Sequence, residues 1–123
     1  MTDAEIIEAL ATQVMGWQLH PTYNSLHGWY VPDGDQFRFE ARADWNPLSK
    51  IQDTWMVLEK IAGRGIELVY NPHHETWFCS IWCPSVTVED EDIKQAICRA
   101  ALRAYTLDEQ IAVNEDPMRE SNP

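Results

Sequence analysis

The sequence predicts an α+β fold, in which a mainly antiparallel β-sheet is sandwiched between α-helices in a single compact domain. Three segments carry apolar residues at helical spacing. Between them lie short segments rich in aromatic and β-branched residues, bounded by proline, asparagine and glycine, as is typical of strands. With 123 residues, the chain has the size of one domain. We expect residues 1–107 to form the sandwich and residues 108–123 an acidic, flexible tail, because the helical spacing fades from residue 108.

The first helix is expected over residues 3–15. Thr2 followed by Glu5 fits a capping box, in which two side chains satisfy free N–H groups at the helix start. Gly16 is a natural stop, because glycine readily adopts the left-handed conformation that ends many helices. Three short strands are expected next, over residues 17–20, 28–31 and 37–41, separated by turn-forming residues that include Pro21, Asn24, Pro32, Asp33 and Gly34.

The second helix is expected to begin after Asn46, with Pro47 at its first position. Apolar residues at helical spacing are predicted to face the core: Leu48, Ile51, Trp55, Leu58 and Ala62. A hairpin follows, with strands over residues 66–70 and 76–83. Both faces of its second strand are largely apolar, so we expect helices on both sides of it and expect Trp55, Trp77 and Trp82 in the core.

The third helix combines small and apolar residues on one face. That face is predicted to hold Ile93, Ala96, Ile97, Ala100, Ala101 and Ala104, with Gln95, Arg99 and Arg103 opposite. The alanines let another backbone come close. The acidic run from Glu89 to Asp92 is expected at the start of this helix, where the helix dipole favours negative charge.

Three blocks of this sequence are distinctive: Val14-Met15-Gly16-Trp17, the segment Trp55 to Lys60, and the segment Ile97 to Ala104. Together they resemble the phage ABA sandwich domain, a small α+β family of bacteriophage and prophage proteins. The resemblance implies a phage or prophage origin and a sheet sandwiched by helices. It implies no catalytic or binding residues, because none is defined for that family.

Charge and composition exclude several classes of function. A formal charge of −11 opposes binding to extended nucleic acid, which needs basic patches. No apolar run is long enough for a membrane span, and the acidic N-terminus lacks the features of a signal peptide. We therefore expect a protein of the host bacterial cytosol, with no membrane partner and with its three cysteines reduced.

Catalytic and metal chemistry are not expected. Cys79, Cys83 and Cys98 with His73 and His74 could be metal ligands, but residues four apart on a strand lie about 13 Å apart. Buried cysteines and exposed turn histidines are the favoured interpretation. The sequence has neither a nucleophile elbow nor a phosphate-binding loop. We predict a protein that is not an enzyme and needs no cofactor.

A ligand site is predicted in the loop-rich region between residues 17 and 46. Aromatic side chains with arginines nearby could stack a base and hold a phosphate. The candidate ligand-binding residues are His20, Trp29, Tyr30, Arg38, Arg42 and Trp45. The alternative is that these aromatics close one end of the sheet or form a homodimer interface.

These expectations point to a small phage-type binding protein that sequesters a nucleotide-type small molecule of the host, in a host-takeover or anti-defence role. The alternative is an acidic inhibitor or DNA mimic that acts on a host protein through residues 89–92 and the tail. Homodimerisation is a third expectation, because small folds often complete their cores at an interface.

Overall fold

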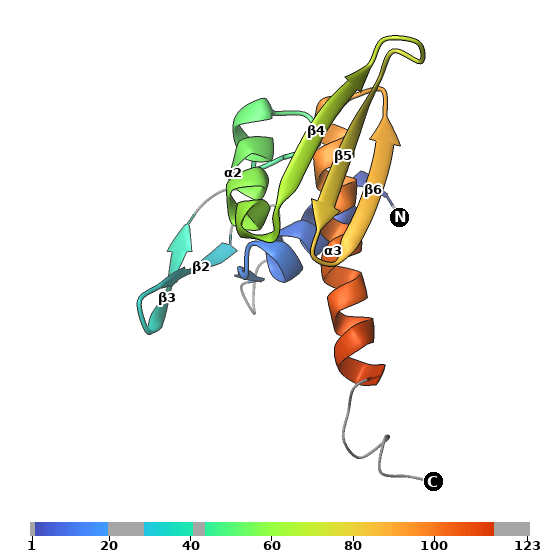
Figure 1. Ribbon diagram of the computed structural model, residues 1–123. Coiled ribbons are helices and arrows are strands. Elements are labelled where there is room, and N and C mark those ends of the chain that lie inside the picture. Colours follow the sequence, from blue (N-terminus) through green and yellow to red (C-terminus); the bar gives the residue numbers. More distant parts are fainter. Residues whose placement is uncertain (1, 20–28, 41–43, 115–123) are drawn as a thin grey trace, which may run out of the picture.

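The computed structural model describes residues 2–19, 29–40 and 44–114, and of residues 19, 29, 30, 33, 37–40 and 109–114 it describes the backbone only. The elements in chain order are α1 (Asp3–Ala9), a π-helical turn (Leu10–Val14), β1 (Gln18–Leu19), β2 (Trp29–Asp33), β3 (Gln36–Glu40), α2 (Ile51–Ile61), a 3₁₀ turn (Ala62–Arg64), β4 (Ile66–Asn71), β5 (Thr76–Trp82), β6 (Ser85–Asp90) and α3 (Ile93–Asn114). The expected α+β class is confirmed (Figure 1).

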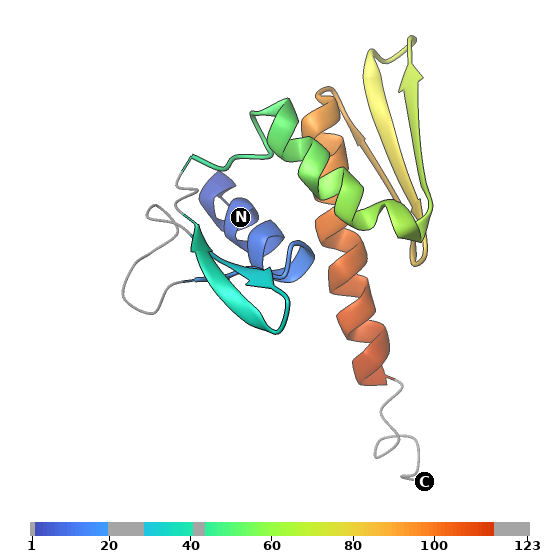
Figure 2. The same cartoon turned by 90° about the vertical axis from the view of Figure 1, so that its left-hand side faces the viewer.

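Two antiparallel sheets lie on opposite sides of the helices. The larger one has the strand order β4-β5-β6, and the smaller one has the order β1-β2-β3. Seen from the side, the larger sheet lies against α3, while the hairpin of β2 and β3 lies beyond α1 on the other side (Figure 2). In the part of the chain that the structure describes, the helices therefore cover only one face of the larger sheet.

Helix α3 is the element on which the others pack. It contacts β5 and β6 on one side and α2 and the π-helical turn on the other. The small face predicted for this helix is confirmed, since Ala96, Ala100, Ala101 and Ala104 are fully buried. Alanine side chains are short enough for the sheet and the other helices to approach the α3 backbone closely.

The first helix is confirmed in its start and its stop. Thr2 Oγ1 accepts a hydrogen bond from the Glu5 backbone N–H at 3.2 Å and donates one to Glu5 Oε1 at 3.2 Å. The last turn widens into a π-helix, with the Met15 N–H bonded to the Leu10 carbonyl at 3.0 Å. Gly16 has a φ of 76°, the left-handed conformation that was expected there.

The second helix begins later than predicted, at Ile51. Residues 46–50 form turns instead, in which the Asn46 side chain accepts the Leu48 N–H at 3.1 Å and Asp53 accepts the Asn46 N–H at 2.8 Å. These side-chain hydrogen bonds satisfy the backbone N–H groups of the turn without a helix, so Pro47 is not the first residue of α2.

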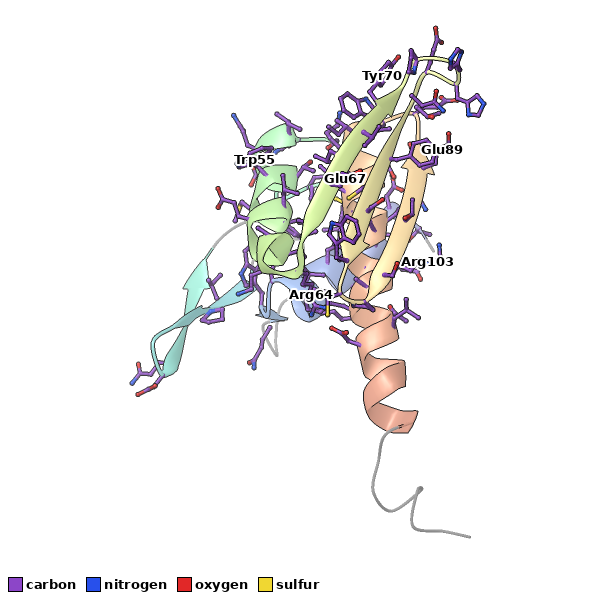
Figure 3. All side chains as sticks on the ribbon, in the orientation of Figure 1. Trp55, Arg64, Glu67, Tyr70, Glu89 and Arg103 are labelled. Atoms are coloured by element: carbon purple, nitrogen blue, oxygen red, sulfur yellow. The ribbon has the colours of Figure 1, made fainter. Side chains whose placement is uncertain are left out.

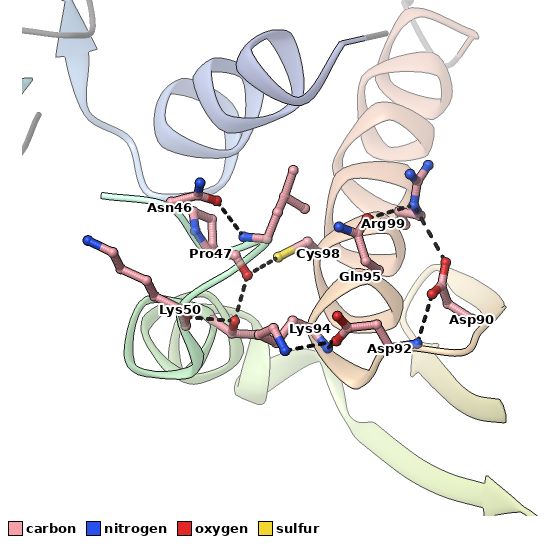
Figure 4. A network of polar contacts seen from close by, with 11 residues as sticks. Asn46, Pro47, Lys50, Asp90, Asp92, Lys94, Gln95, Cys98 and Arg99 are labelled. Carbon is pink, nitrogen blue, oxygen red and sulfur yellow. Dashed lines mark hydrogen bonds and ion pairs between the residues drawn. The ribbon is translucent and has the colours of Figure 1, made fainter. Parts of the chain in front are cut away.

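The core-facing side predicted for α2 is only partly correct: Leu48, just before the helix, is buried and Leu58 packs against the core, but the other predicted residues are exposed. The buried residues of α2 are Thr54, Val57 and Ile61, whereas Ile51 is 52% exposed and Trp55 is 53% exposed. Thr54 can be buried because its hydroxyl donates to the Pro47 carbonyl at 2.6 Å. The Cys98 thiol of α3 points at the same carbonyl from the other side, at 3.4 Å (Figure 4).

The prediction that β5 is covered on both sides is wrong. Cys79 and Ile81 are buried against α3, but on the outer face Trp82 is 65% exposed and Val69 of β4 is 46% exposed. Trp77 packs against the core as expected, whereas Trp82 does not. Within the described part of the chain, all helices lie on the inner side of this sheet (Figure 2).

The ends of other elements differ from expectation as well. Strand β2 continues through Pro32 to Asp33, and its turn with β3 contains Gly34 at a φ of 63°.

Strand β6 includes Glu89 and Asp90, so only the second half of the acidic run precedes α3. Asp92 accepts the Lys94 N–H at 2.8 Å there. Helix α3 continues to Asn114, and residues 115–123 of the expected tail lie outside the described residues.

No helix among the described residues combines the length and the apolar character needed to cross a membrane.

We predict that Thr54→Val lowers the free energy of unfolding by about 1–2 kcal/mol, because valine keeps the shape but leaves the buried Pro47 carbonyl with a thiol donor alone. Urea unfolding measures this change. Thr87→Val is the matched control on the exposed sheet face, where we expect a change within about 0.5 kcal/mol. Equal stability of Thr54→Val and the wild type would contradict the structural role of this hydroxyl.

Candidate functional site

The residues predicted to bind a ligand are only partly described by the structure. His20 and Arg42 lie outside the described residues, as do the side chains of Trp29, Tyr30 and Arg38. The backbones of the last three are in β2 and β3, where Tyr30 pairs with Phe39 and Val31 with Arg38. This set of residues therefore stays a prediction.

Trp45 belongs to the core. It is 4% exposed, and its ring centroid lies 4.7 Å from that of Trp17, which is also buried. Among the described residues its indole N–H has no hydrogen-bond partner. The contact between the two indoles joins the end of the first helical segment to the turns that precede α2.

The cysteines and histidines considered as metal ligands do not converge. His73 and His74 are exposed in the turn between β4 and β5, and Cys83 is exposed at the opposite end of β5. Cys79 and Cys98 are buried between the sheet and α3. Burial raises the pKa of the Cys79 thiol to about 11 and that of the Cys98 thiol to about 12, so both are protonated at neutral pH.

An accessible surface lies on the outer face of the larger sheet, formed by alternate residues of β4, β5 and β6. Its residues are Glu67, Val69, Phe78, Ser80, Trp82, Ser85, Thr87 and Glu89. We call this surface the outer sheet face. Val69 lies opposite Phe78, and the hydroxyls of Ser80 and Thr87 share a hydrogen bond of 3.1 Å across the two strands.

Trp82 is the most exposed large apolar residue described, and its position is fixed by Gly65. Its backbone N–H donates to the Gly65 carbonyl at 3.0 Å. A Cβ atom at Gly65 would lie 2.7 Å from Trp82 Cδ1, so the indole rests directly on the glycine backbone. Gly65 also has a φ of 80°, a conformation that other residues rarely adopt.

Arg64 holds the neighbouring β5–β6 turn to α3. Its guanidinium donates to the Cys83 carbonyl at 3.1 Å and pairs with Asp108 at 2.6 Å. The same group lies 4.2 Å above the Tyr105 ring centroid. Figure 3 shows Arg64 at the end of the sheet where it meets α3. Trp82 thus lies next to a turn that Arg64 attaches to α3.

Carboxylates surround the apolar residues of the outer sheet face. Glu89 accepts a hydrogen bond from the Thr76 hydroxyl at 2.6 Å and lies 3.3 Å from His74 Nδ1. The bond from Thr76, supported by His74, lowers the pKa of Glu89, so this carboxyl group is ionised at neutral pH. Glu67 lies on the same face, opposite Ser80.

A second exposed apolar site lies on α2, where Ile51 and Trp55 are one turn apart and line a hollow of about 390 Å³ with Gln52. Figure 3 shows Trp55 on the side of α2 that faces away from the sheet.

The sequence contained a signal for the exposure of Trp82: the neighbouring strands place Glu67, Thr87 and Glu89 on its face, and charged residues there favour solvent.

Comparison with known proteins points to phage proteins. The sequence model of the phage ABA sandwich domain matches residues 8–102. A crystal structure of a phage protein from Bacillus cereus is similar in fold, with a TM-score of 0.59 and 17% sequence identity over 85% of this chain and 92% of the other. None of the curated proteins is detectably similar in sequence.

We predict that Gly65→Ala lowers the free energy of unfolding by about 1–3 kcal/mol. The new Cβ would clash with Trp82, and alanine would have to adopt the positive φ that this position requires. Chemical denaturation measures the loss. Gly63→Ala is the matched control: a Cβ there meets nothing within 4 Å, and we expect no destabilisation. Equal losses for both variants would show that the Trp82 contact is not what requires glycine.

Proposed function

The chain belongs to the phage ABA sandwich domain family, and we propose that it is a binding protein that docks a basic partner protein on the outer sheet face. This family is not known as enzymatic. The observation that carries the proposal is Trp82, which is 65% exposed although its position is fixed. Fixed, exposed aromatic side chains are typical of the residues that contribute most to protein interfaces.

The energy available from Trp82 is large for a single residue. A tryptophan has about 150–250 Å² of surface, so covering the exposed part of this one would contribute about 3 kcal/mol. Because Gly65 and the β5–β6 turn already fix the ring, little conformational entropy is lost on binding. Val69 and Phe78 add apolar surface further along the same face.

The charge of the outer sheet face favours a basic partner. Glu67 and Glu89 flank its apolar residues, and the whole chain has a formal charge of −11. A second copy of the chain would bring the same carboxylates together, which opposes self-association through this face. Nucleic acid would be repelled for the same reason. A protein with lysine or arginine around an apolar site is complementary to this surface.

This proposal corresponds to the alternative function expected from the sequence, an acidic inhibitor of a host protein, but with a different surface. The acidic run is divided between the end of β6 and the start of α3, whereas Glu67 comes from β4. Sequestration of a nucleotide-type molecule is a second proposal. What favours it is an arginine-lined groove on α3, which is separate from the outer sheet face.

The test places a photo-crosslinking amino acid at Thr87, in the middle of the outer sheet face, and exposes the protein to host lysate. We expect a single host protein to be crosslinked. After purification of that protein, calorimetry should show that Trp82→Gln weakens its binding at least about tenfold. Higher salt should weaken the binding too, because the partner is basic.

Trp55→Gln is the matched control, since it removes another exposed tryptophan from a different surface. We expect it to bind the partner as the wild type does. Crosslinking only to a second copy of the chain, or equal losses for the two tryptophan variants, would contradict the proposal.

A further inference from the structure

We propose that the groove between α1, α3 and β6 binds a small molecule that carries a phosphate group. The groove measures about 450 Å³, within the usual size of small-molecule sites. Its lining residues are Ile6, Val88, Arg99, Leu102, Arg103 and Thr106. Val88 is on the inner side of β6, so the groove and the outer sheet face are distinct surfaces.

The two arginines make this groove positive in a strongly acidic protein. Arg99 and Arg103 are one helical turn apart, at a spacing that brings their like charges close together and disfavours the helix without an anion. Arg99 is bound to Gln95 at 3.2 Å and is 3.9 Å from an Asp90 carboxylate oxygen (Figure 4). Arg103 forms no ion pair or hydrogen bond with any residue that the structure describes.

Three other cations of the described chain are paired more closely than Arg103, whereas Lys60 on α2 is exposed and, like Arg103, forms no ion pair with a described residue. Lys50 lies 3.2 Å from Asp44, Arg64 is paired with Asp108, and Lys94 lies 3.2 Å from Asp92. An arginine left free beside a second arginine and a groove is therefore available for an external anion. A phosphate has three or more oxygens that two guanidinium groups can share, whereas a carboxylate is satisfied by one.

The apolar residues of the groove define the rest of the ligand. Ile6 of α1, Val88 of β6 and Leu102 of α3 come from three elements and give the groove apolar walls. Thr106 Oγ1 donates to the Leu102 carbonyl at 2.9 Å, so its oxygen can still accept a hydrogen bond. The groove thus fits a molecule with a flat or apolar part next to its phosphate, such as a nucleotide.

The test uses the full chain with ADP, inorganic pyrophosphate and adenosine as probes, measured by calorimetry and by amide chemical shifts. We expect ADP to bind more tightly than pyrophosphate, and both more tightly than adenosine. The amides that shift should belong to Ile6 and to residues 99–106. We expect Arg103→Gln to weaken ADP and pyrophosphate binding about tenfold.

Lys60→Gln is the matched control, because it removes one exposed positive charge from α2 instead of α3. It should leave ADP binding within about twofold of the wild type, since only long-range charge changes. Three results would overturn the proposal: no binding of ADP or pyrophosphate at about 1 mM, equal weakening by the two substitutions, or shifts confined to residues 17–46. The last result would indicate that the ligand binds the loop-rich region between residues 17 and 46 instead of the groove. None of them depends on the partner protein, so the two proposals fail separately.

Discussion

The close approach of other elements to α3 is the constraint on which the rest of this structure depends. Four fully buried alanines of this helix allow the sheet to pack on one side while α2 and the π-helical turn pack on the other. The buried Pro47 carbonyl, which receives both the Thr54 hydroxyl and the Cys98 thiol, fixes α2 against α3. A larger side chain at any of these alanines would separate the layers, because protein interiors are close-packed.

Placing α3 at the centre determines which surfaces are left for binding. All the described helices lie on one side of the larger sheet, so no described helix covers its outer face, where Trp82 is exposed. The other surface arises where α1 and β6 meet α3 without filling the space above Leu102, which leaves the groove beside Arg99 and Arg103. The first surface is apolar with carboxylates and the second is apolar with arginines, so they suit partners of opposite charge.

The sequence predicts some of the features that depend on local spacing. The small face of α3 and the capping box at Thr2 could both be identified from the pattern alone. Thr54 could not be recognised as a core residue, because its burial depends on a carbonyl seven residues earlier. The groove was beyond prediction for a similar reason: Ile6, Val88 and Arg103 are far apart in the sequence and only the packing of three elements brings them together.

The most direct test of this arrangement is oxidative footprinting of the isolated protein, with the modification of each tryptophan read by mass spectrometry. An open outer sheet face predicts rapid oxidation of Trp82, comparable to that of Trp55, and strong protection of Trp17 and Trp45 in their buried contact. Protection of Trp82 to the level of Trp17 would mean that the outer sheet face is covered, and it would contradict the one-sided packing from which the proposed docking surface follows.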